Sequence, residues 1–483
     1  MTNESPAEIK ALPLWLAAAP FVLLLVLFAA GTVYMDAGES LIVMSMLGAA
    51  TLASAIAIRQ GKDWQDIQQS AIDKVASVFP IILILLSIGA LIGAWVLSGT
   101  IPMFVWFGLT IISPAYIVLT AFLAAALMSI VTGTSWGSAG TIGVALMGIA
   151  TVINAPIAMV AGAIVSGAYF GDKMSPLSDS TNIAALSAGA DLYGHIRHMT
   201  YTAFPSFVLA VLVFAFVGTG NGQAGDAMPE AARVMIKDIE TVFRLEWFAL
   251  LPPAVIFLAI IRKWPPVLGI VAAAATGAVV GILGQGFVIE DGLLSLTTGF
   301  NAEMLRSLDG FSGSLSQPFL ELINRGGVYS MVNTLVVIIS AFILAGAMDA
   351  SGALKILVNG LLKGAKSVFS LVATTMASSL VMLSLTSHGG VTCLIVGGLY
   401  QDGYKERKLA PVNLSRSLED SVTLMDPLMP WTVSALFMAN TLGVPTLDYF
   451  PWAIFCLGGP MFSLLLAAQY KRTGFGLKPT QTG

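Results

Sequence analysis

Two short stretches of small and polar residues interrupt apolar sequence and carry groups that could bind a cation. The first runs from Thr132 to Gly140 and contains three glycines and four hydroxyl side chains. Glycines let a helix unwind, and the freed carbonyls and hydroxyls can then ligate a hard cation where they line a cavity. We expect Thr134 and Ser135 to be such ligands. A tightly packed helix face of small residues is the alternative interpretation.

The same stretch matches the pattern G-x-S-x-G, with Ser135 at its centre, which is typical of a hydrolase nucleophile. Such a nucleophile needs a turn from a strand into a helix, and a long apolar helical region does not provide one. We therefore expect that the protein is not an enzyme.

A second polar element, Gly171–Asn182, contains the carboxylates Asp172 and Asp179. Charged groups at membrane depth face a cavity or a partner, and Pro176 breaks any helix here. Burial favours the protonated form of a carboxylate, so H⁺ and Na⁺ can compete for Asp172. The alternative is a loop outside the membrane that caps a helix and pairs Asp172 with Lys173. The other candidate coupling residues of this element are Lys173, Ser175, Ser178, Thr181 and Asn182.

The matching break in the second half of the chain is Thr386–Gly390. Ser387 is the expected cation ligand here. His388 could be a proton relay, because an imidazole titrates near physiological pH, or a hydrogen-bonded structural residue. The sequence leaves both roles open.

Carboxylates and a hydroxyl that resemble the first acidic element follow this second break. Asp420 is the expected counterpart of Asp172, whereas Glu419 could instead pair with Arg416 in the adjacent basic loop. The candidates of this element are Glu419, Asp420, Thr423 and Asp426.

The composition places these elements in a membrane. Of 483 residues, 57% are hydrophobic and only 10% are charged, against roughly 25% charged in soluble domains. No charged residue or histidine occurs in the 97 residues from Val75 to Gly171. At ~20 residues per crossing, we expect an all-α polytopic membrane protein with about 11–13 transmembrane helices. The net charge of −4 argues against a nucleic-acid partner, and the two cysteines indicate no disulfide or metal framework.

Loop charges predict the orientation. Basic residues concentrate in 59–74, 349–366, 401–417 and 471–483, so these segments and both termini should face the cytoplasm. The acidic segments 36–39 and 290–325 should face outward. Residues 59–74 are amphipathic and predict a helix that lies on the membrane surface.

Weak internal similarity predicts two inverted repeats. Ser98-Gly99 recurs as Ser351-Gly352, 253 positions later, and the same offset relates Thr134 to Ser387 and Ser135 to His388. Asp172 aligns with Asp420 at an offset of 248. One repeat begins from a basic loop and the other from an acidic loop, so they should be inverted. Inverted repeats with interrupted helices are typical of secondary transporters.

These features divide the chain into five parts. We expect N-terminal helices and the interfacial helix at 1–74, the first repeat at 75–218, a linker with connecting helices at 219–325, the second repeat at 326–470, and a cytoplasmic tail at 471–483.

The acidic elements resemble the signatures of the NhaC-type Na⁺/H⁺ antiporters over most of the chain. The matching segments are Gly171–Asp179, Asn413–Asp420, Gly133–Ser135 and Pro430-Trp431. The resemblance implies a carrier of the bacterial inner membrane that exchanges Na⁺ for H⁺ and needs no cofactor. Related members exchange malate for lactate or move amino acids. Asp426 and His388 depart from the family pattern, and both change the charge at the site.

We therefore expect a secondary carrier that works by alternating access in the lipid bilayer. Asp172 and Asp420 would be the main coupling carboxylates, and Asp179 and Asp426 would assist them. The alternative is a Na⁺- or H⁺-coupled carrier of a small organic acid or amino acid, for which Lys173 would supply the fixed positive charge. The sequence leaves the oligomeric state open, a homodimer included.

Overall fold

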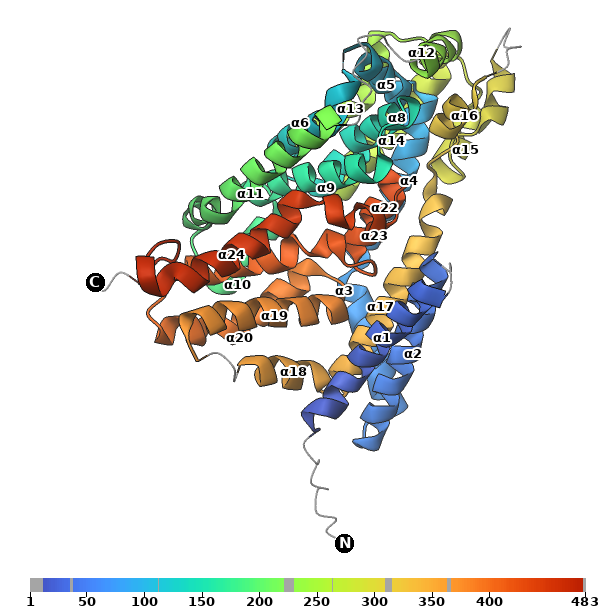
Figure 1. Cartoon of the computed structure of the whole chain (residues 1–483). Helices are drawn as coiled ribbons and strands as arrows, with labels where there is room; N and C mark the ends of the chain where they lie inside the picture. Colours follow the sequence, from blue (N-terminus) through green and yellow to red (C-terminus); the bar gives the residue numbers. More distant parts are fainter. Residues whose placement is uncertain are drawn as a thin grey trace.

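The structure is a bundle of long helices with short helices packed between them (Figure 1). The computed structural model describes residues 12–34, 38–111, 113–220, 230–262, 264–308, 315–362 and 366–480. In this part of the chain the elements are helical, apart from two isolated bridges, Phe300 with Arg325 and Leu409 with Pro479. The predicted all-α fold is confirmed. Residues 36–37 of the predicted acidic segment 36–39, and residues 221–229 and 309–314 of the predicted linker, lie outside the described residues.

Two N-terminal helices, α2 and α3, pack against one long helix of the second half, α17 (Val332–Ala350), and α1 packs against α2. Figure 1 shows α2 beside α17. On α3, Ile67 is buried, whereas Trp64 and Ile72 are more than half exposed. The three helices are α1 (Leu14–Tyr34), α2 (Gly38–Arg59) and α3 (Trp64–Ser77).

The first half continues with eight helices, two of which flank the first polar break. They are α4 (Phe79–Leu97), α5 (Thr100–Ile111), α6 (Ile117–Thr132), α7 (Ser135–Ser138), α8 (Val144–Val152), α9 (Ile157–Met174), α10 (Asp179–Ala188) and α11 (Leu192–Gly220). A π-helical segment, Ala139–Gly143, joins α7 to α8.

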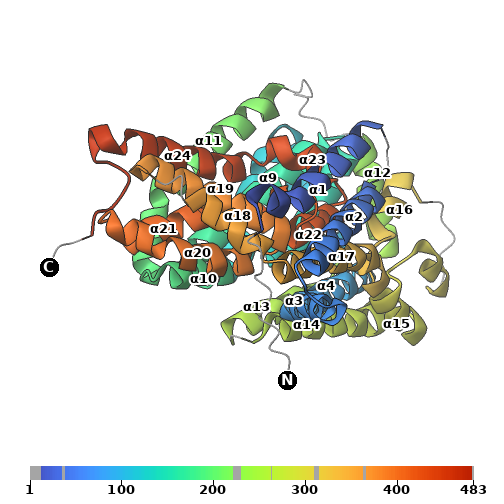
Figure 2. The ribbon, with the colours of Figure 1, turned by 90° about the horizontal axis from the view of Figure 1, so that it is seen from below.

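Five helices connect the halves: α12 (Glu230–Val242), α13 (Leu251–Ile261), α14 (Pro266–Val280), α15 (Ile289–Thr297) and α16 (Gln317–Ile323). The second half consists of α17, α18 (Ala353–Leu362), α19 (Val368–Thr386), α20 (Gly389–Glu406), α21 (Pro411–Leu418), α22 (Val433–Leu442), α23 (Thr446–Tyr449) and α24 (Ile454–Thr473). A π-helical segment, Glu419–Thr423, follows α21. Figure 2 shows α10 of the first half beside α20 and α21 of the second.

Nine helices in the described part of the chain are long and apolar enough to cross a membrane. Three more pairs of helices qualify together but bend by more than 40° at a short break, which raises the number to twelve. The chain is therefore a polytopic membrane protein. The expectation of about 11–13 spans is met when the bent pairs are counted.

Close packing of α9 against α6 places the acidic element. A Cβ atom on Gly167 would lie 2.2 Å from the Phe122 carbonyl oxygen, and one on Gly171 would lie 2.4 Å from Cβ of Ser129. Only glycine allows this approach of the two helices. The Ser129 hydroxyl also donates a 2.6 Å hydrogen bond to the Ala168 carbonyl. Asp172 is thereby held beside the end of α6.

Helix ends recur in the two halves at a spacing of 254 residues. Gly133 and Ser387 end α6 and α19 in the left-handed conformation, with φ of 69° and 53°. The same spacing relates the non-glycine residues Asn154 and Lys408, which have φ of 52° and 54°. It also relates residues that cap other helix starts and ends, namely Ser113 with Ser367, Ser178 with Thr432, and Gly189 with Gly443.

This spacing corrects two alignments made from the sequence. Thr134 corresponds to His388, and Gly133 corresponds to Ser387, so the predicted register of the breaks is wrong by one residue. The spacing also places Asp426, rather than Asp420, at the position of Asp172. Helix ends are decisive here because a cap needs one particular backbone conformation, whereas clusters of Asp and Ser can be matched in several registers.

Candidate functional site

The first break is a change of helix direction built on one glycine. Gly133 has φ of 69°, and a Cβ atom there would lie 2.6 Å from Cβ of Leu177. The next residue, Thr134, caps α7, and its hydroxyl accepts a 3.3 Å hydrogen bond from the Gly137 N–H. The helix is therefore interrupted between Thr132 and Ser135, as the glycines predicted, and Thr134 lies outside the helices as the cap of α7.

The second break has the same construction with different residues. Ser387 ends α19, and His388 caps α20 by accepting a 3.2 Å hydrogen bond from the Val391 N–H at Nδ1. Thr386 contacts Thr392 at 2.7 Å, as Thr132 contacts Ser138 at 3.3 Å in the first break. His388 thus has a structural role as a helix cap, and a further role in proton transfer stays a prediction.

A cavity of about 650 Å³ lies between the two breaks. It extends to the turn between α13 and α14, where Trp264 and Pro265 line it. Seven of the predicted site residues line the cavity: Thr134, Ser135, Asp172, Asp179, His388, Thr423 and Asp426. The tertiary structure therefore brings parts of both polar breaks and both acidic elements to one space.

Two carboxylates in this cavity each accept a hydrogen bond from a serine. The Ser135 hydroxyl donates to Oδ2 of Asp172 at 3.0 Å, and the Ser434 hydroxyl donates to Oδ2 of Asp426 at 2.7 Å. Oδ1 of Asp426 is buried and has no hydrogen-bond partner among the described residues. This oxygen is available to a bound cation or proton.

The predicted residues Lys173 and Asp420 lie outside the cavity lining of the described residues and form an ion pair with each other. Both side chains are fully buried. The Thr202 hydroxyl adds a 3.1 Å hydrogen bond to Oδ1 of Asp420. Glu419 is also fully buried and accepts a 3.3 Å hydrogen bond from Ser180. No ion pair between Glu419 and Arg416 is present in the described part of the chain.

The remaining predicted residues brace the turn between α9 and α10. The Thr181 hydroxyl reaches the carbonyls of Asp172 and Lys173, both at 3.2 Å. Asn182 donates to the Ser178 carbonyl at 2.7 Å, and Ser175 donates to the Ile130 carbonyl at 3.2 Å. These contacts hold the backbone next to Asp172. The Ser387 hydroxyl is buried without a partner among the described residues.

The sequence analysis missed several polar residues that line the cavity, among them Thr141, Tyr169, Ser180, Cys393 and Ser434. The spacing of 254 is the signal that could have found Tyr169 from the predicted residue Thr423. It relates Tyr169 to Thr423 and Ser180 to Ser434, all of which line the cavity. A tyrosine and a threonine share a hydroxyl but look unrelated in a sequence comparison.

A second buried polar network, also unexpected, joins α11 and α21 to the C-terminal tail. Arg416 is fully buried and donates a 2.6 Å hydrogen bond to the Gly476 carbonyl. His198 lies 3.1 Å from both Arg416 and the Asn413 side chain. His195 lies 2.7 Å from the Ser415 hydroxyl. The network anchors residues that the sequence had suggested as loop residues.

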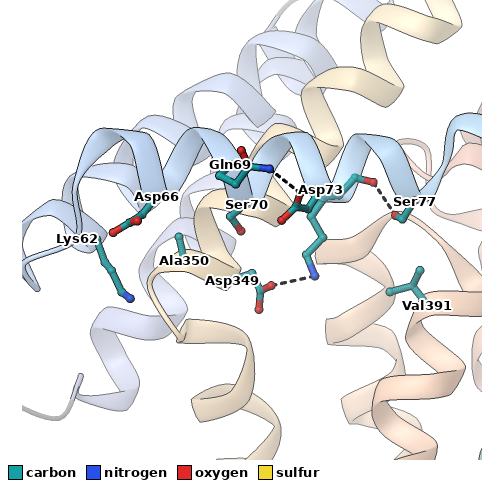
Figure 3. Close-up of a pocket in the computed structure, with 10 residues that line it drawn as sticks. Lys62, Asp66, Gln69, Ser70, Asp73, Ser77, Asp349, Ala350 and Val391 are labelled. Atoms are coloured by element: carbon teal, nitrogen blue, oxygen red, sulfur yellow. Dashed lines mark hydrogen bonds and ion pairs between the residues drawn. The ribbon is translucent and has the colours of Figure 1, made fainter.

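A separate hollow of about 450 Å³ lies between α3 and the end of α17 (Figure 3). Lys74 and Asp349 form a 3.0 Å ion pair across it, and Gln69 donates to Asp73 at 2.8 Å. The Ser70 hydroxyl donates to the Gly346 carbonyl at 2.9 Å. Polar contacts therefore fasten α3 to α17.

No group of three or more His, Cys, Asp or Glu side chains in the described residues is arranged to hold a metal ion. A cation in the cavity would instead be bound by a carboxylate together with hydroxyl and carbonyl oxygens. Such oxygen ligands suit hard cations.

The chain is similar to known antiporters over most of its length. The chain is 40% identical over 93% of its length to an uncharacterized Na⁺/H⁺ antiporter of Haemophilus influenzae, covering 95% of that protein. It is 34% identical over 83% of its length to the Na⁺/H⁺ antiporter NhaC of Alkalihalophilus pseudofirmus, covering 84% of that protein. It is 32% identical over 88% of its length to a malate-2H⁺/Na⁺-lactate antiporter of Bacillus subtilis, covering 87% of that protein. The model of the Na⁺/H⁺ antiporter family matches residues 167–469. The chain therefore belongs to the Na⁺/H⁺ antiporter family.

Proposed function

We propose that the chain exchanges Na⁺ for H⁺ across the bacterial inner membrane by alternating access. The observation that carries this proposal is the charge of the cavity. Asp172, Asp179 and Asp426 line it, and no Lys or Arg is among the described residues that do so. A cavity that is lined by carboxylates, with no positively charged side chain among its described lining residues, favours a cationic substrate.

Asp172 and Asp426 are the exchangeable carboxylates in this proposal. Each can hold a proton or contribute to a cation site, because a buried carboxylate is unfavourable unless a proton neutralises it or a bound cation balances its charge. Ser135 and Ser434 orient the two groups through the hydrogen bonds described above. Asp179 assists from the first turn of α10.

Asp420 has a different role in this proposal from the one expected from the sequence. Asp420 is the permanent ion-pair partner of Lys173 and neutralises the positive charge of the lysine. The lysine then contributes no net charge to the cavity. We expect the pair to persist while Na⁺ and H⁺ exchange at Asp172 and Asp426.

We also propose that residues 75–218 and 326–470 are inverted repeats, with both termini in the cytoplasm. The spacing of 254 between helix ends supports the duplication, and the basic and acidic loops support the inversion. A cavity between the two breaks can then open to one side or the other as the repeats move.

The alternative function is the coupled transport of a small organic acid or amino acid. The malate-2H⁺/Na⁺-lactate antiporter among the relatives motivates it. An organic anion would need a positive partner in the cavity, and Lys173 is already paired with Asp420. This arrangement favours Na⁺/H⁺ exchange over the transport of an organic anion.

The test uses purified protein in proteoliposomes that contain a pH-sensitive dye. A Na⁺ pulse should dissipate a preset pH gradient, and Asp172→Asn should abolish the response. Asp402→Asn, on the exposed part of α20, is the matched control and should leave the response intact. If Na⁺ has no effect while malate, lactate or an amino acid does, the alternative function is correct.

A further inference from the structure

Tyr169 is an unusual residue in the cavity wall. It lies on α9, three residues before Asp172, and is only 2% exposed. Its hydroxyl has no hydrogen-bond partner of ordinary geometry among the described residues. A buried tyrosine hydroxyl normally finds a partner, because leaving it unpaired is unfavourable. Because Tyr169 also lines the cavity, its hydroxyl can pair with a group or ion that binds there.

Tyr169 shares the cavity with the two exchangeable carboxylates, Asp172 and Asp426, and with Ser434. The Ser434 hydroxyl donates a 2.7 Å hydrogen bond to Oδ2 of Asp426. The Tyr169 hydroxyl thus belongs to the region where the two halves of the site meet.

The second half of the chain repeats this arrangement. Thr423 lies 254 positions after Tyr169, three residues before Asp426, and also lines the cavity. Each exchangeable carboxylate is therefore preceded by a hydroxyl-bearing residue that lines the same space. Recurrence at the same position in both halves is not required by packing, because a phenol ring and a threonine fill very different volumes.

We infer that the Tyr169 hydroxyl is a direct ligand of the transported cation, between Asp172 and Asp426. A hydroxyl oxygen offers lone pairs to a hard cation without adding charge. It can therefore strengthen cation binding while leaving the two carboxylates to exchange protons. The inference rests on the proposed Na⁺/H⁺ exchange.

The experiment compares Tyr169→Phe with the wild type. Phenylalanine keeps the ring and loses only a hydroxyl that has no ordinary partner among the described residues, so the variant should fold. We expect the KM for Na⁺ to rise about tenfold with Vmax within about twofold, since tenfold corresponds to about 1.4 kcal/mol. Na⁺ binding to the protein in detergent, measured by calorimetry, should weaken by the same factor.

Tyr400→Phe is the matched control. The Tyr400 hydroxyl is bonded to Ser378 at 2.7 Å and to the Thr374 carbonyl at 3.0 Å, away from the cavity lining. This variant should keep the wild-type KM for Na⁺ even if it is less stable.

The outcomes separate the two proposals. Unchanged Na⁺ binding in Tyr169→Phe, with exchange still abolished in Asp172→Asn, would overturn the ligand role and leave the proposed function standing. If Tyr169→Phe does not transport, calorimetry decides, because wild-type affinity would contradict the inference and weakened affinity would support it. Absence of Na⁺-driven exchange in the wild type would refute the proposed function and the inference with it.

Discussion

Lys173 and Asp420, which are 247 residues apart in the sequence, form an ion pair with both side chains fully buried. The pair joins the end of α9 to the π-helical segment that follows α21. Removing one partner of such a pair leaves an uncompensated charge, whereas replacing both with apolar residues can be nearly neutral. Replacing one or both partners therefore tests whether Asp420 takes part in coupling Na⁺ to H⁺ or only neutralises the charge of Lys173.

Single variants of this pair should be much less stable than the double variant. We expect Lys173→Met and Asp420→Leu each to lower the free energy of unfolding by about 3–5 kcal/mol. The double variant should recover most of this loss and should retain Na⁺/H⁺ exchange. Thermal unfolding in detergent and the proteoliposome assay measure the two quantities. A stable but inactive double variant would return Asp420 to the role of a coupling carboxylate.

The serines that bond to the exchangeable carboxylates should affect Na⁺ affinity. Ser135→Ala and Ser434→Ala each remove a hydrogen bond to a carboxylate, and a bond to a charged group contributes about 1.5–3 kcal/mol. We expect the KM for Na⁺ to rise by about tenfold or more in each variant. Ser138→Ala is the control, because the Ser138 hydroxyl donates to the Thr134 carbonyl at 2.9 Å and lies outside the described cavity lining. Equal KM values in all three variants would contradict the assigned roles.

Acidification should weaken the apparent affinity for Na⁺, because H⁺ and Na⁺ compete for the same carboxylates. Mass action predicts that KM rises by about tenfold per pH unit for each proton that a Na⁺ ion displaces. Replacement of one exchangeable carboxylate, in Asp426→Asn, should make this dependence less steep. The measurement is KM for Na⁺ between about pH 6 and 9, a range that brackets neutral pH. A pH-independent KM would show that the two ions do not share a site.

The residues that end α6 and α19 should differ in their tolerance of change. A Cβ atom on Gly133 would be 2.6 Å from Leu177 and would stand on a backbone with φ of 69°. Gly133→Ala should therefore lower the free energy of unfolding by about 2–4 kcal/mol. In Ser387→Gly, glycine adopts the same left-handed backbone conformation without strain. This variant should change the free energy of unfolding by no more than about 1 kcal/mol. Exchange should persist in Ser387→Gly, and its loss there would support the cation-ligand role that the sequence had suggested.

The sequence by itself determined the class of protein and the location of the polar breaks. In lipid, the backbone polar groups of long apolar segments have to form their hydrogen bonds within helices, and clusters of glycine and polar residues favour an interruption of a helix. These are local effects that do not depend on the rest of the fold. The family signatures around Asp172 and Asp420 were likewise readable from the chain.

Only the tertiary structure decided which polar groups face the cavity. Asp420 lies in the π-helical segment Glu419–Thr423, whereas Asp426 begins a separate 3-10 helix, Asp426–Leu428. The two side chains therefore belong to different elements although they are only six residues apart. As a result, Asp426 lines the cavity and Asp420 pairs with Lys173. Tyr169 and Ser434 joined the site because contacts between distant helices, rather than local residue pattern, placed their hydroxyls there.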